Sequence, residues 1–521
     1  PRAFVVPFKL SFEVEDTTPP TITDVKPPLD TTSGGVRPEI SARWSDEKGI
    51  DLSSAGLLRD GEDVTAKAEL DEEGVSFIPA GDLERGVHTI EVRVSDTSGN
   101  PGNRVRQHFA CGEPYRTIVK IDEHRRTTIN GEPFFPRILY VRIDNVLAHP
   151  WYDKLARAGF NCFHFVISVP ACEVIAKDKG CPVDEVYYWA EMKAMENAGV
   201  KLYGDIGNYF NMSIPILKER YGAEELTPSL YEKAAKLFAE SCAWYDRHAE
   251  LLAYKIDEPS GQEGYDRCKS MWEGLLVSGH KRPAFWVLNS PDAARTLGGV
   301  ADGIGIDCYP IPSRPLVQVA KYVDRTHQML DYKKPVWFVV QAFDWRLLQP
   351  PFGPFAKIGK KKEEVMKTIP EDFVFTPTPQ QIRCMTYLAL THDVQGILWW
   401  SLCWDYKVVS IVDFPEDWEA LLELGGEVRH LSEMLLSTEH VEIGGDAEEL
   451  GVHVLGKMLE GTLYVIAVNP NEELPVAPTF RLPAGSYSKV NVLFENRGMK
   501  LAGETFQDLL KPLDVHVYRI Q

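Results

Sequence analysis

The chain has 521 residues, more than one hydrophobic core usually organises, so its length predicts two to four domains. Asp and Glu (76) outnumber Lys and Arg (56), and the net charge of −20 argues against nucleic acid as a partner. Hydrophobic residues make up 44% of the chain, but no apolar run approaches the ~18–20 residues that span a bilayer, so we expect a soluble protein.

The nine cysteines are an odd number, lie far apart and form no CxxC pair, so neither a disulfide framework nor a zinc module is encoded. The histidines and carboxylates show no metal-ligand spacing, and no glycine-rich phosphate loop opens a helix. We therefore expect no metal and no cofactor. The sequence starts at Pro1 rather than Met, so export cannot be read from a leader and the location has to be inferred from domain type.

Residues 1–112 consist of short alternating runs between Pro, Gly and Asp clusters, a pattern typical of an all-β sandwich. Three segments resemble the bacterial immunoglobulin-like modules that accompany secreted and surface enzymes: Leu57–Gly61, Gly86–Thr89 and Val94–Asn100. The resemblance implies a domain that spaces or docks and carries no chemistry. It also implies an extracellular or cell-surface location for the protein.

Residues 113–436 show a different pattern, in which short apolar runs alternate with helical stretches. Strands that are apolar throughout are buried on both faces, and eight of them, each followed by a helix, predict a (β/α)8 barrel, the TIM barrel. The eight runs are Phe135–Val141, Phe160–Ile167, Val200–Ile206, Leu251–Ile256, Pro283–Leu288, Gly303–Ile306, Val336–Val340 and Gly396–Trp400.

Amphipathic segments with a helical period lie between the runs and after the last one. They include Asp184–Ala198, Ser229–His248, Glu263–Ser278, Leu316–Leu330, Pro379–His392 and Asp417–Leu436. The connection Ala342–Pro377 is far longer than an ordinary loop and contains the basic run Lys357–Lys362. We expect this connection to form a lid or a wall of the cleft, with the basic run on a solvated surface.

Residues 437–521 return to the period-two alternation of strands, with turns such as Asn469–Asn471, and predict a small antiparallel β-sandwich. The predicted strands are Gly451–Leu455, Thr462–Asn469, Thr479–Leu482, Val490–Leu493 and Val515–Ile520. The predicted fold is therefore a catalytic barrel flanked by an N-terminal immunoglobulin-like sandwich and a C-terminal accessory sandwich.

Acidic, amide and aromatic side chains follow five of the eight runs, at the barrel end where chemistry is placed in this fold. They are Asp205 after the third run; Asp257 and Glu258 after the fourth; Asp307 and Tyr309 after the sixth; Gln341, Asp344 and Trp345 after the seventh; and Trp399, Trp400, Trp404 and Asp405 at the eighth. Carboxylates can protonate a glycosidic oxygen and stabilise an oxocarbenium-like centre, while Trp and Tyr pack on the apolar face of a pyranose. The pattern predicts a carbohydrate substrate.

The segment Tyr254–Pro259 resembles the Asn-Glu-Pro or Asp-Glu-Pro signature of barrel glycoside hydrolases, in which the Glu is the general acid/base. Three further segments, Gly303–Pro310, Pro335–Gln341 and Gly396–Ser401, are similar to strands 6, 7 and 8 of the same clan A-like barrels. The resemblance covers most of the predicted barrel. It implies an enzyme that cleaves O-glycosidic bonds of an oligo- or polysaccharide with Glu258 as the acid/base.

One position departs from this resemblance, because Gln341 stands where retaining clan A enzymes carry their nucleophilic Glu. A carboxamide cannot be a carboxylate nucleophile. Three hypotheses remain. In the first, Asp257 and Glu258 act as in the substrate-assisted β-N-acetylhexosaminidases, whose Asp-Glu pair they resemble. The 2-acetamido oxygen of the substrate then attacks, Asp257 polarises that amide and Glu258 protonates the leaving oxygen.

In the second hypothesis, another rim carboxylate is the nucleophile or an inverting base, with Asp307, Asp344 and Asp405 as candidates in that order. In the third, Gln341 marks a barrel that binds glycans without cleaving them. Two neighbouring carboxylates in a desolvated cleft cannot both ionise easily, so we expect one to stay protonated and assign Glu258 as the acid.

The remaining candidates would bind the substrate. Tyr309 and Trp400 are the preferred stacking residues, ahead of Trp345 and Trp404. His164, at the end of the second predicted strand, can bind a sugar hydroxyl or serve the structure. Gln341, Trp399 and Asp205 complete the predicted binding set. Consecutive strand residues face opposite sides, so Asp257 and Glu258 reach one substrate only if the strand ends or bulges there. The acidic charge favours neutral or amino sugars.

Overall fold

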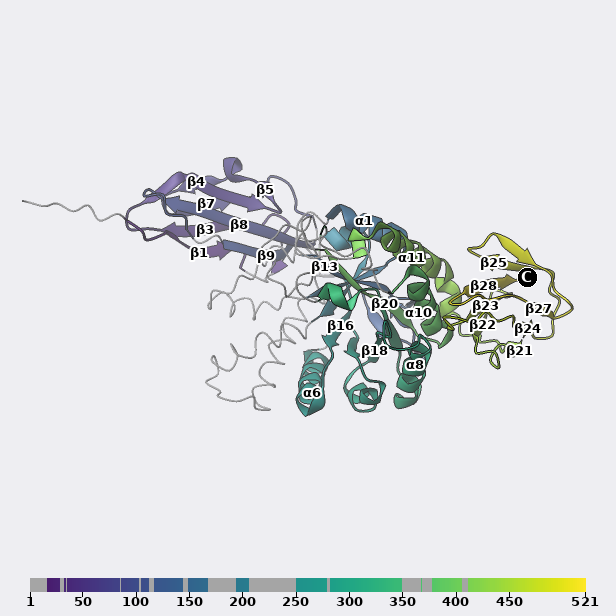
Figure 1. The fold of residues 1–521 in the computed structure, drawn as a ribbon. Helices are drawn as coiled ribbons and strands as arrows, with labels where there is room; N and C mark the ends of the chain where they lie inside the picture. Colours follow the sequence, from purple (N-terminus) through teal and green to yellow (C-terminus); the bar gives the residue numbers. More distant parts are fainter. Residues whose placement is uncertain are drawn as a thin grey trace, which may run out of the picture. The chain divides into compact units, whose positions relative to one another are not determined.

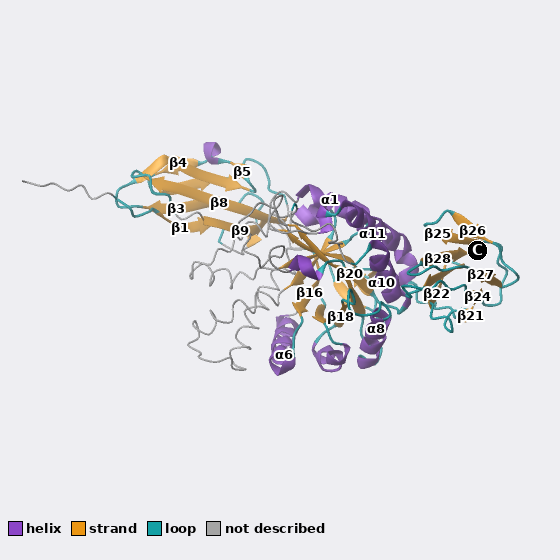
Figure 2. Cartoon of the chain, in the orientation of Figure 1, coloured by secondary structure: helices purple, strands orange, loops and turns teal. Residues whose placement is uncertain are grey.

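The computed structural model describes residues 16–28, 32–33, 35–84, 86–102, 105–111, 117–143, 149–166, 194–205, 250–278, 282–348, 367, 377–404 and 411–521. The chain divides into two compact units, one made mainly of residues 1–114 and one made mainly of residues 115–521. Figures 1 and 2 show the elements of each unit. No helix in the described ranges is both long and apolar enough to cross a membrane.

The N-terminal unit is a β-sandwich. One sheet has the order β1 (Thr21–Lys26), β3 (Ile40–Ser45), β7 (Gly74–Phe77) and β6 (Glu69–Asp71). The other has the order β2 (Thr32–Ser33), β9 (Val105–Cys111), β8 (Gly86–Asp96), β4 (Ile50–Arg59) and β5 (Glu62–Asp63). Alternate residues of β3 (Ile40, Ala42 and Trp44) are buried and share one core with Ile90 and Phe109 of the other sheet. The predicted sandwich is confirmed, and its immunoglobulin-like character stays a prediction.

The second unit contains a closed barrel of eight parallel strands, as the apolar runs predict (Figure 1). The strands are β13 (Arg137–Ile143), β14 (Cys162–Val166), β15 (Lys201–Asp205), β16 (Leu251–Asp257), β17 (Ala284–Leu288), β18 (Gly303–Cys308), β19 (Val336–Gln341) and β20 (Gly396–Trp404). Pairing of β13 with β20 closes the circle. Every residue of β17, β18 and β19 is buried, which explains why these runs lack the alternation of half-exposed strands.

A small antiparallel sheet precedes the barrel and was not predicted. It consists of β10 (Val119–Ile121), β11 (Thr127–Ile129) and β12 (Glu132–Phe134). Val119, Ile129 and Phe134 join the same apolar cluster as Ile138 and Trp337, which lie at the starts of barrel strands. The small sheet therefore covers the amino-terminal end of the barrel, and the opposite end remains for a site.

Four predicted helices are present: α6 (Gly261–Ser278), α8 (Gln318–Met329), α10 (Pro379–Thr391) and α11 (Pro415–Leu436). Helix α10 starts with a capping box, in which the Thr378 hydroxyl accepts from the Gln381 N–H and the Gln381 side chain accepts from the Thr378 N–H. Pro379 occupies the first turn, where a missing N–H costs nothing. The helices α1 (His149–Ala158) and α7 (Ala294–Leu297) complete the larger elements described.

Some predicted elements fall outside the described residues. These are the helix Ser229–His248, residues 184–193 of the helix Asp184–Ala198, and most of the connection Ala342–Pro377 with its basic run. Their predicted roles stay predictions, including that of the long connection as a lid or wall.

The C-terminal part of the second unit is a β-sandwich, as predicted. Its larger sheet has the order β22 (His453–Leu459), β23 (Thr462–Val468), β28 (Val515–Ile520), β25 (Val490–Leu493) and β26 (Arg497–Met499). Its smaller sheet has the order β21 (Gly444–Gly445), β24 (Thr479–Arg481) and β27 (Thr505–Gln507). Val465, Phe480, Phe506 and Tyr518 from both sheets share one core.

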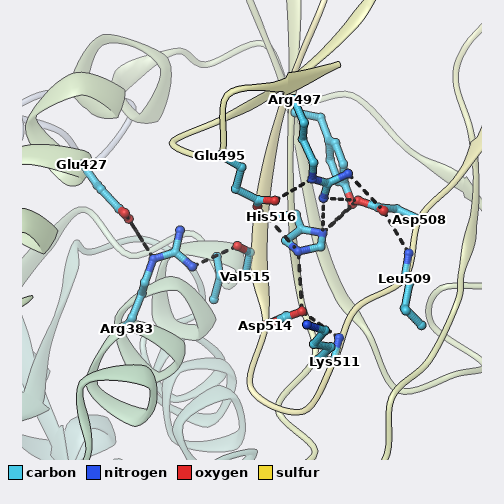
Figure 3. Close-up of polar contacts among 11 residues, drawn as sticks. Arg383, Glu427, Glu495, Arg497, Asp508, Leu509, Lys511, Asp514, Val515 and His516 are labelled. Atoms are coloured by element: carbon cyan, nitrogen blue, oxygen red, sulfur yellow. Dashed lines mark hydrogen bonds and ion pairs between the residues drawn. The ribbon is translucent and has the colours of Figure 1, made fainter. Parts of the chain in front are cut away.

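Polar contacts join α10 and α11 to this sandwich (Figure 3). Arg383 of α10 donates through Nε to Glu427 of α11 (2.9 Å) and through Nη1 to the carbonyl oxygen of Val515 on β28 (2.9 Å). The hydroxyl of Tyr387 donates to the same Glu427 carboxylate (2.8 Å). Glu427 thus accepts from a half-buried and a buried donor of the neighbouring helix, Arg383 and Tyr387, and Arg383 also reaches the sandwich.

A second polar cluster lies within the sandwich itself, beside the first (Figure 3). Arg497 forms ion pairs with Asp508 (Nη2 to Oδ2, 2.6 Å) and with Glu495 (Nε to Oε2, 2.6 Å). His516 contacts Asp508 through Nδ1 at 2.9 Å. These charged side chains pair with one another, which fits a structural role at the end of the sandwich.

Replacement of Glu427 by Leu removes the acceptor of both Arg383 and Tyr387 but keeps a side chain that suits a buried position. We expect the free energy of unfolding of the barrel-containing unit to fall by about 3 kcal/mol, because the guanidinium loses its partner. Chemical denaturation followed by tryptophan fluorescence measures the loss. Glu419→Leu on the same helix is the control: its 3.2 Å pair with Lys154 is exposed and should contribute less than about 1 kcal/mol. Equal losses in the two variants would contradict the prediction.

Candidate functional site

A cavity of about 290 Å³ lies at the carboxyl-terminal end of the barrel strands. Among the described residues, its lining includes three carboxylates and three large aromatic side chains: Asp257, Glu258, Asp307, Tyr309, Trp345 and Trp400. Residues in or just after β16, β18, β19 and β20 therefore meet at one place, as closure of the barrel requires. Tyr140 and Lys255 also line this cavity, called the pocket below.

Asp257 and Glu258 are consecutive, yet both line the pocket because strand β16 ends between them. Glu258 has a φ of +38°, a left-handed conformation that costs a residue with a Cβ about 1–2 kcal/mol. Its N–H still donates to the carbonyl oxygen of Val287 on the next strand (2.9 Å). The backbone thus turns at this residue and places its side chain beside that of Asp257, as the sequence requires for a shared substrate.

Asp307, at the end of β18, lies against Glu258. Its side chain is 4% exposed and is hydrogen-bonded to the side chains of Glu258 and Tyr309. Burial, followed by the charge of Glu258, raises the pKa of Asp307 well above its ordinary value. The raised pKa favours the protonated form of Asp307, which can donate a hydrogen bond to the side chain of Glu258.

Aromatic rings form one wall of the pocket. Tyr309 and Trp400 stack with their ring centroids 5.5 Å apart and an interplanar angle of 23°. Phe343 and Trp400 make an edge-to-face contact with a centroid distance of 4.4 Å. Trp345 is 43% exposed, and its Nε1 donates to the carbonyl oxygen of Ile311 (3.2 Å), which fixes the plane of the indole. The wall offers fixed π-faces of the kind that pack against a sugar ring.

Lys255 is a residue of this site that the sequence analysis missed. It precedes Asp257 by two positions, and residues two apart share one face of a strand. Its ammonium lies 3.2 Å from Asp257 Oδ1 and 3.5 Å from Asp205 Oδ2, with the lysine only 2% exposed. Burial opposes this charge, but the two carboxylates outweigh burial and raise the pKa of Lys255. A lysine inside an otherwise apolar barrel run was the signal available in the sequence.

His164 and Asp205 lie beneath the pocket rather than in its described lining. Both are fully buried, and His164 Nε2 is 3.2 Å from Asp205 Oδ2. The imidazole stacks under Tyr140 at a centroid distance of 3.9 Å. Burial and the nearby Lys255 ammonium lower the pKa of His164 to about 4, so the ring is neutral near pH 7. The contacts of both residues connect them to the site through Lys255.

Gln341 and Asp344 make contacts away from the described lining of the pocket. Gln341 is fully buried, accepts from the N–H of Ile311 (3.0 Å) and donates to the carbonyl oxygens of Ile311 (3.0 Å) and Phe343 (3.4 Å). Asp344 binds the guanidinium of Arg346 at 2.6 Å. These contacts account for a Gln at the end of β19, because an amide can donate and accept along the same backbone and a carboxylate cannot.

The predicted site residues on β20 lie in different surroundings. Trp399 is fully buried, and its Nε1 donates to Thr386 Oγ1 of α10 (3.1 Å), so it packs between the barrel and its helices. Its neighbour Trp400 faces the pocket, as alternation along the strand requires. The side chain of Trp404 and the whole of Asp405 lie outside the described residues, and their predicted roles stay predictions.

One group of carboxylates in the described ranges is close enough to hold a cation. The oxygens of Asp16, Asp46 and Asp96, in the N-terminal unit, lie within 4.8 Å of one another. Asp96 already accepts from the backbone and side chain of Asn100 (both 2.8 Å). Asp96 is buried and the other two are half-buried, and this group belongs to a different unit from the pocket.

No protein-family profile and no curated protein matches this sequence. Among solved structures, the chain is similar to a glycoside hydrolase family 5 protein from Bacteroides vulgatus, with 11% identity, a TM-score of 0.50, and coverage of 77% of this chain and 93% of that one. It is also similar to a family GH27 β-L-arabinopyranosidase from Geobacillus stearothermophilus (12% identity, TM-score 0.46, coverage 74% and 96%). An α-amylase from Geobacillus thermoleovorans has 11% identity, a TM-score of 0.46 and coverage of 74% and 98%.

The first of these likenesses establishes the fold. The chain has a (β/α)8 barrel, the fold that it shares with the family 5 protein, and the predicted resemblance to clan A-like barrels is confirmed at the level of the fold.

Replacement of Asp307 by Asn should stabilise the protein in a pH-dependent way. With a raised pKa, native Asp307 keeps a proton that the unfolded chain releases above about pH 4, so wild-type stability falls as the pH rises beyond that point. Asn cannot ionise, so the gain in Tm should be near zero at about pH 4 and should grow toward about pH 8. Scanning calorimetry across that range measures it. Asp292→Asn, at an exposed position paired with Arg325, is the control, and a gain that is constant with pH would contradict the prediction.

Proposed function

We propose that this protein is a glycoside hydrolase that acts at the pocket by carboxylate acid/base catalysis. The observation that carries the proposal is the meeting of Asp257, Glu258 and Asp307 beside the stacked rings of Tyr309 and Trp400. Carboxylates supply the proton and the negative charge that cleavage of a glycosidic bond requires, and aromatic faces hold the sugar. The glycoside hydrolase fold of the barrel supports the same conclusion.

Glu258 is the general acid in this proposal. It is exposed at the rim, whereas Asp307 is buried and hydrogen-bonded to it. The shared proton passes to Glu258 and then to the leaving oxygen as the bond from that oxygen to the anomeric carbon breaks. The bonding electrons stay on the leaving oxygen, and the anomeric carbon becomes positively charged. A water then adds its oxygen to that carbon and returns one proton to the carboxyl pair, which completes the hydrolysis.

Asp307 serves as the proton-sharing partner of Glu258 rather than as the opposing carboxylate. The carboxyl groups of a retaining pair lie about 5–5.5 Å apart and those of an inverting pair about 6.5–9.5 Å apart. The hydrogen bond between Asp307 and Glu258 is shorter than either spacing. This contact favours a single acid built from two carboxyl groups.

Asp257 supplies the negative charge. Its Oδ1 lies 3.2 Å from the buried ammonium of Lys255, and its side chain is 37% exposed at the pocket. A carboxylate there can stabilise the positive anomeric carbon or bond to it. It can equally hold a 2-acetamido group whose oxygen attacks in its place, as in the substrate-assisted route.

The rest of the chain suits a hydrolase of oligo- or polysaccharide outside the cell or at its surface. We propose that residues 1–112 and 437–521 are accessory domains of a catalytic segment 113–436, and that the first is immunoglobulin-like. The acidic charge of −20 favours neutral or amino sugars over polyanionic glycans.

The first test compares Glu258→Gln with wild type on a panel of aryl glycosides. We expect kcat/KM to fall about 10³-fold on substrates with poor leaving groups and far less on those with good ones, because a good leaving group needs little protonation. Asp266→Asn, on helix α6 and hydrogen-bonded to Gln262, is the matched control and should retain full activity. Binding of glycans by a wild-type protein that cleaves no member of a broad panel would replace the proposal with a glycan-binding barrel.

A second test distinguishes the routes. The substrate-assisted route requires a 2-acetamido group and is inhibited by a thiazoline mimic of the cyclised intermediate. Direct stabilisation by Asp257 predicts activity on plain glycosides instead, with Asp257→Asn lowering kcat about 10²–10⁴-fold. Rates on matched glucosides and N-acetylglucosaminides, measured with Glu258→Gln and Asp257→Asn, decide between the two routes.

A further inference from the structure

We propose that Lys255 is a positioning residue that holds Asp257 as a charged carboxylate directed into the pocket. The inference deepens the proposed function and rests on it. It assigns the negative charge of the site to one carboxylate and names the group that keeps it there.

The geometry supplies the first argument. The Lys255 ammonium contacts Asp257 Oδ1 at 3.2 Å, Asp205 Oδ2 at 3.5 Å and His164 Nε2 at 3.3 Å. It also lies over the ring of Tyr140, 5.1 Å from the centroid. A long, flexible side chain is thus restrained from several sides, and its ammonium donates to an oxygen of Asp257.

Burial supplies the second argument. At 2% exposure, Lys255 is shielded from water, whereas the side chain of Asp257 is 37% exposed, so this ion pair lies at the boundary between the buried interior and the pocket. Asp205 is fully buried and places a second carboxylate 3.5 Å from the ammonium. The ammonium therefore has an acidic partner in the barrel interior besides Asp257.

Within the described ranges, the titratable groups in contact with Lys255 lie on its own strand and on three others of the barrel. They are Tyr140 on β13, His164 on β14, Asp205 on β15 and Asp257 on β16. His164 is neutral near pH 7 because burial and the ammonium lower its pKa to about 4. The local charge is then one ammonium against two carboxylates, of which only Asp257 lines the pocket.

This arrangement separates two neighbouring carboxylates by role. Asp257 pairs with a buried cation, whereas Glu258 pairs with the protonated Asp307. Two residues that are adjacent in sequence thus have different partners: a cation for Asp257 and a second carboxyl group for Glu258. Such a division is what acid catalysis beside a charged carboxylate requires.

The test compares Lys255→Met and Lys255→Arg by the pH dependence of kcat/KM on the best aryl glycoside. We expect Lys255→Met to lower kcat about 100-fold with little change in KM, and to move the acid limb of the profile to higher pH, because protons compete better for Asp257 without the ammonium. Lys255→Arg keeps the charge and should return the acid limb toward its wild-type position, even with a lower kcat.

Lys457→Met is the matched control for a purely structural effect. Lys457 is also buried (4% exposed) and is paired with Asp393 (3.4 Å), but it lies on β22 of the C-terminal sandwich. We expect this variant to change stability and to leave the pH profile unshifted. An unshifted acid limb in Lys255→Met, with activity lost only in proportion to unfolded protein, would overturn the proposal.

A measurement without turnover keeps the inference separate from the proposed function. Calorimetric binding of the cationic iminosugar 1-deoxynojirimycin depends on a negative pocket, so its affinity should fall at acid pH, with a midpoint that Lys255→Met moves upward. If wild type cleaves no glycoside but shows this shift, the hydrolase proposal fails and the role of Lys255 stands. An unchanged midpoint, or a protein that neither cleaves glycosides nor binds the iminosugar, would overturn the role of Lys255.

Discussion

The buried ion pairs of Lys255 are the interaction on which the chemistry of this barrel depends. A charge inside an apolar barrel is stable only with partners of opposite sign, and Asp205 and Asp257 provide them from two adjacent strands. This requirement ties the interior of the barrel to its rim. The same ammonium that satisfies a buried carboxylate below also contacts the one that faces the pocket.

Closure of the barrel supplies the rest of the site. Eight strands that pair in sequence order bring all of their carboxyl ends to one rim, so Asp257 and Asp307 meet although fifty residues separate them. The small sheet β10–β12 covers the opposite end of the core. Stacked Tyr309 and Trp400 then line a wall in which Trp400 belongs to β20 and Tyr309 directly follows β18.

Much of the fold could be predicted, because runs such as Val336–Val340 are buried on both faces and therefore apolar throughout. The small sheet was missed because strands of three residues are too short to show alternation. In the site, the position of Glu258 after a strand was readable. The contacts of Gln341 with Ile311 and of Asp344 with Arg346 were not, because they depend on how the chain turns after the strand. Lys255 was overlooked because its partner Asp205 is distant in sequence.

The left-handed backbone of Glu258 lowers the stability of the fold at a residue whose carboxyl group the proposed chemistry needs. Gly or Asn adopts that conformation more readily, so either would relax the turn while removing the carboxylate. Selection for heat resistance alone would therefore favour replacement of this Glu. In laboratory evolution toward stability, a single substitution at this position would produce an inactive barrel. Libraries that keep position 258 fixed avoid that outcome.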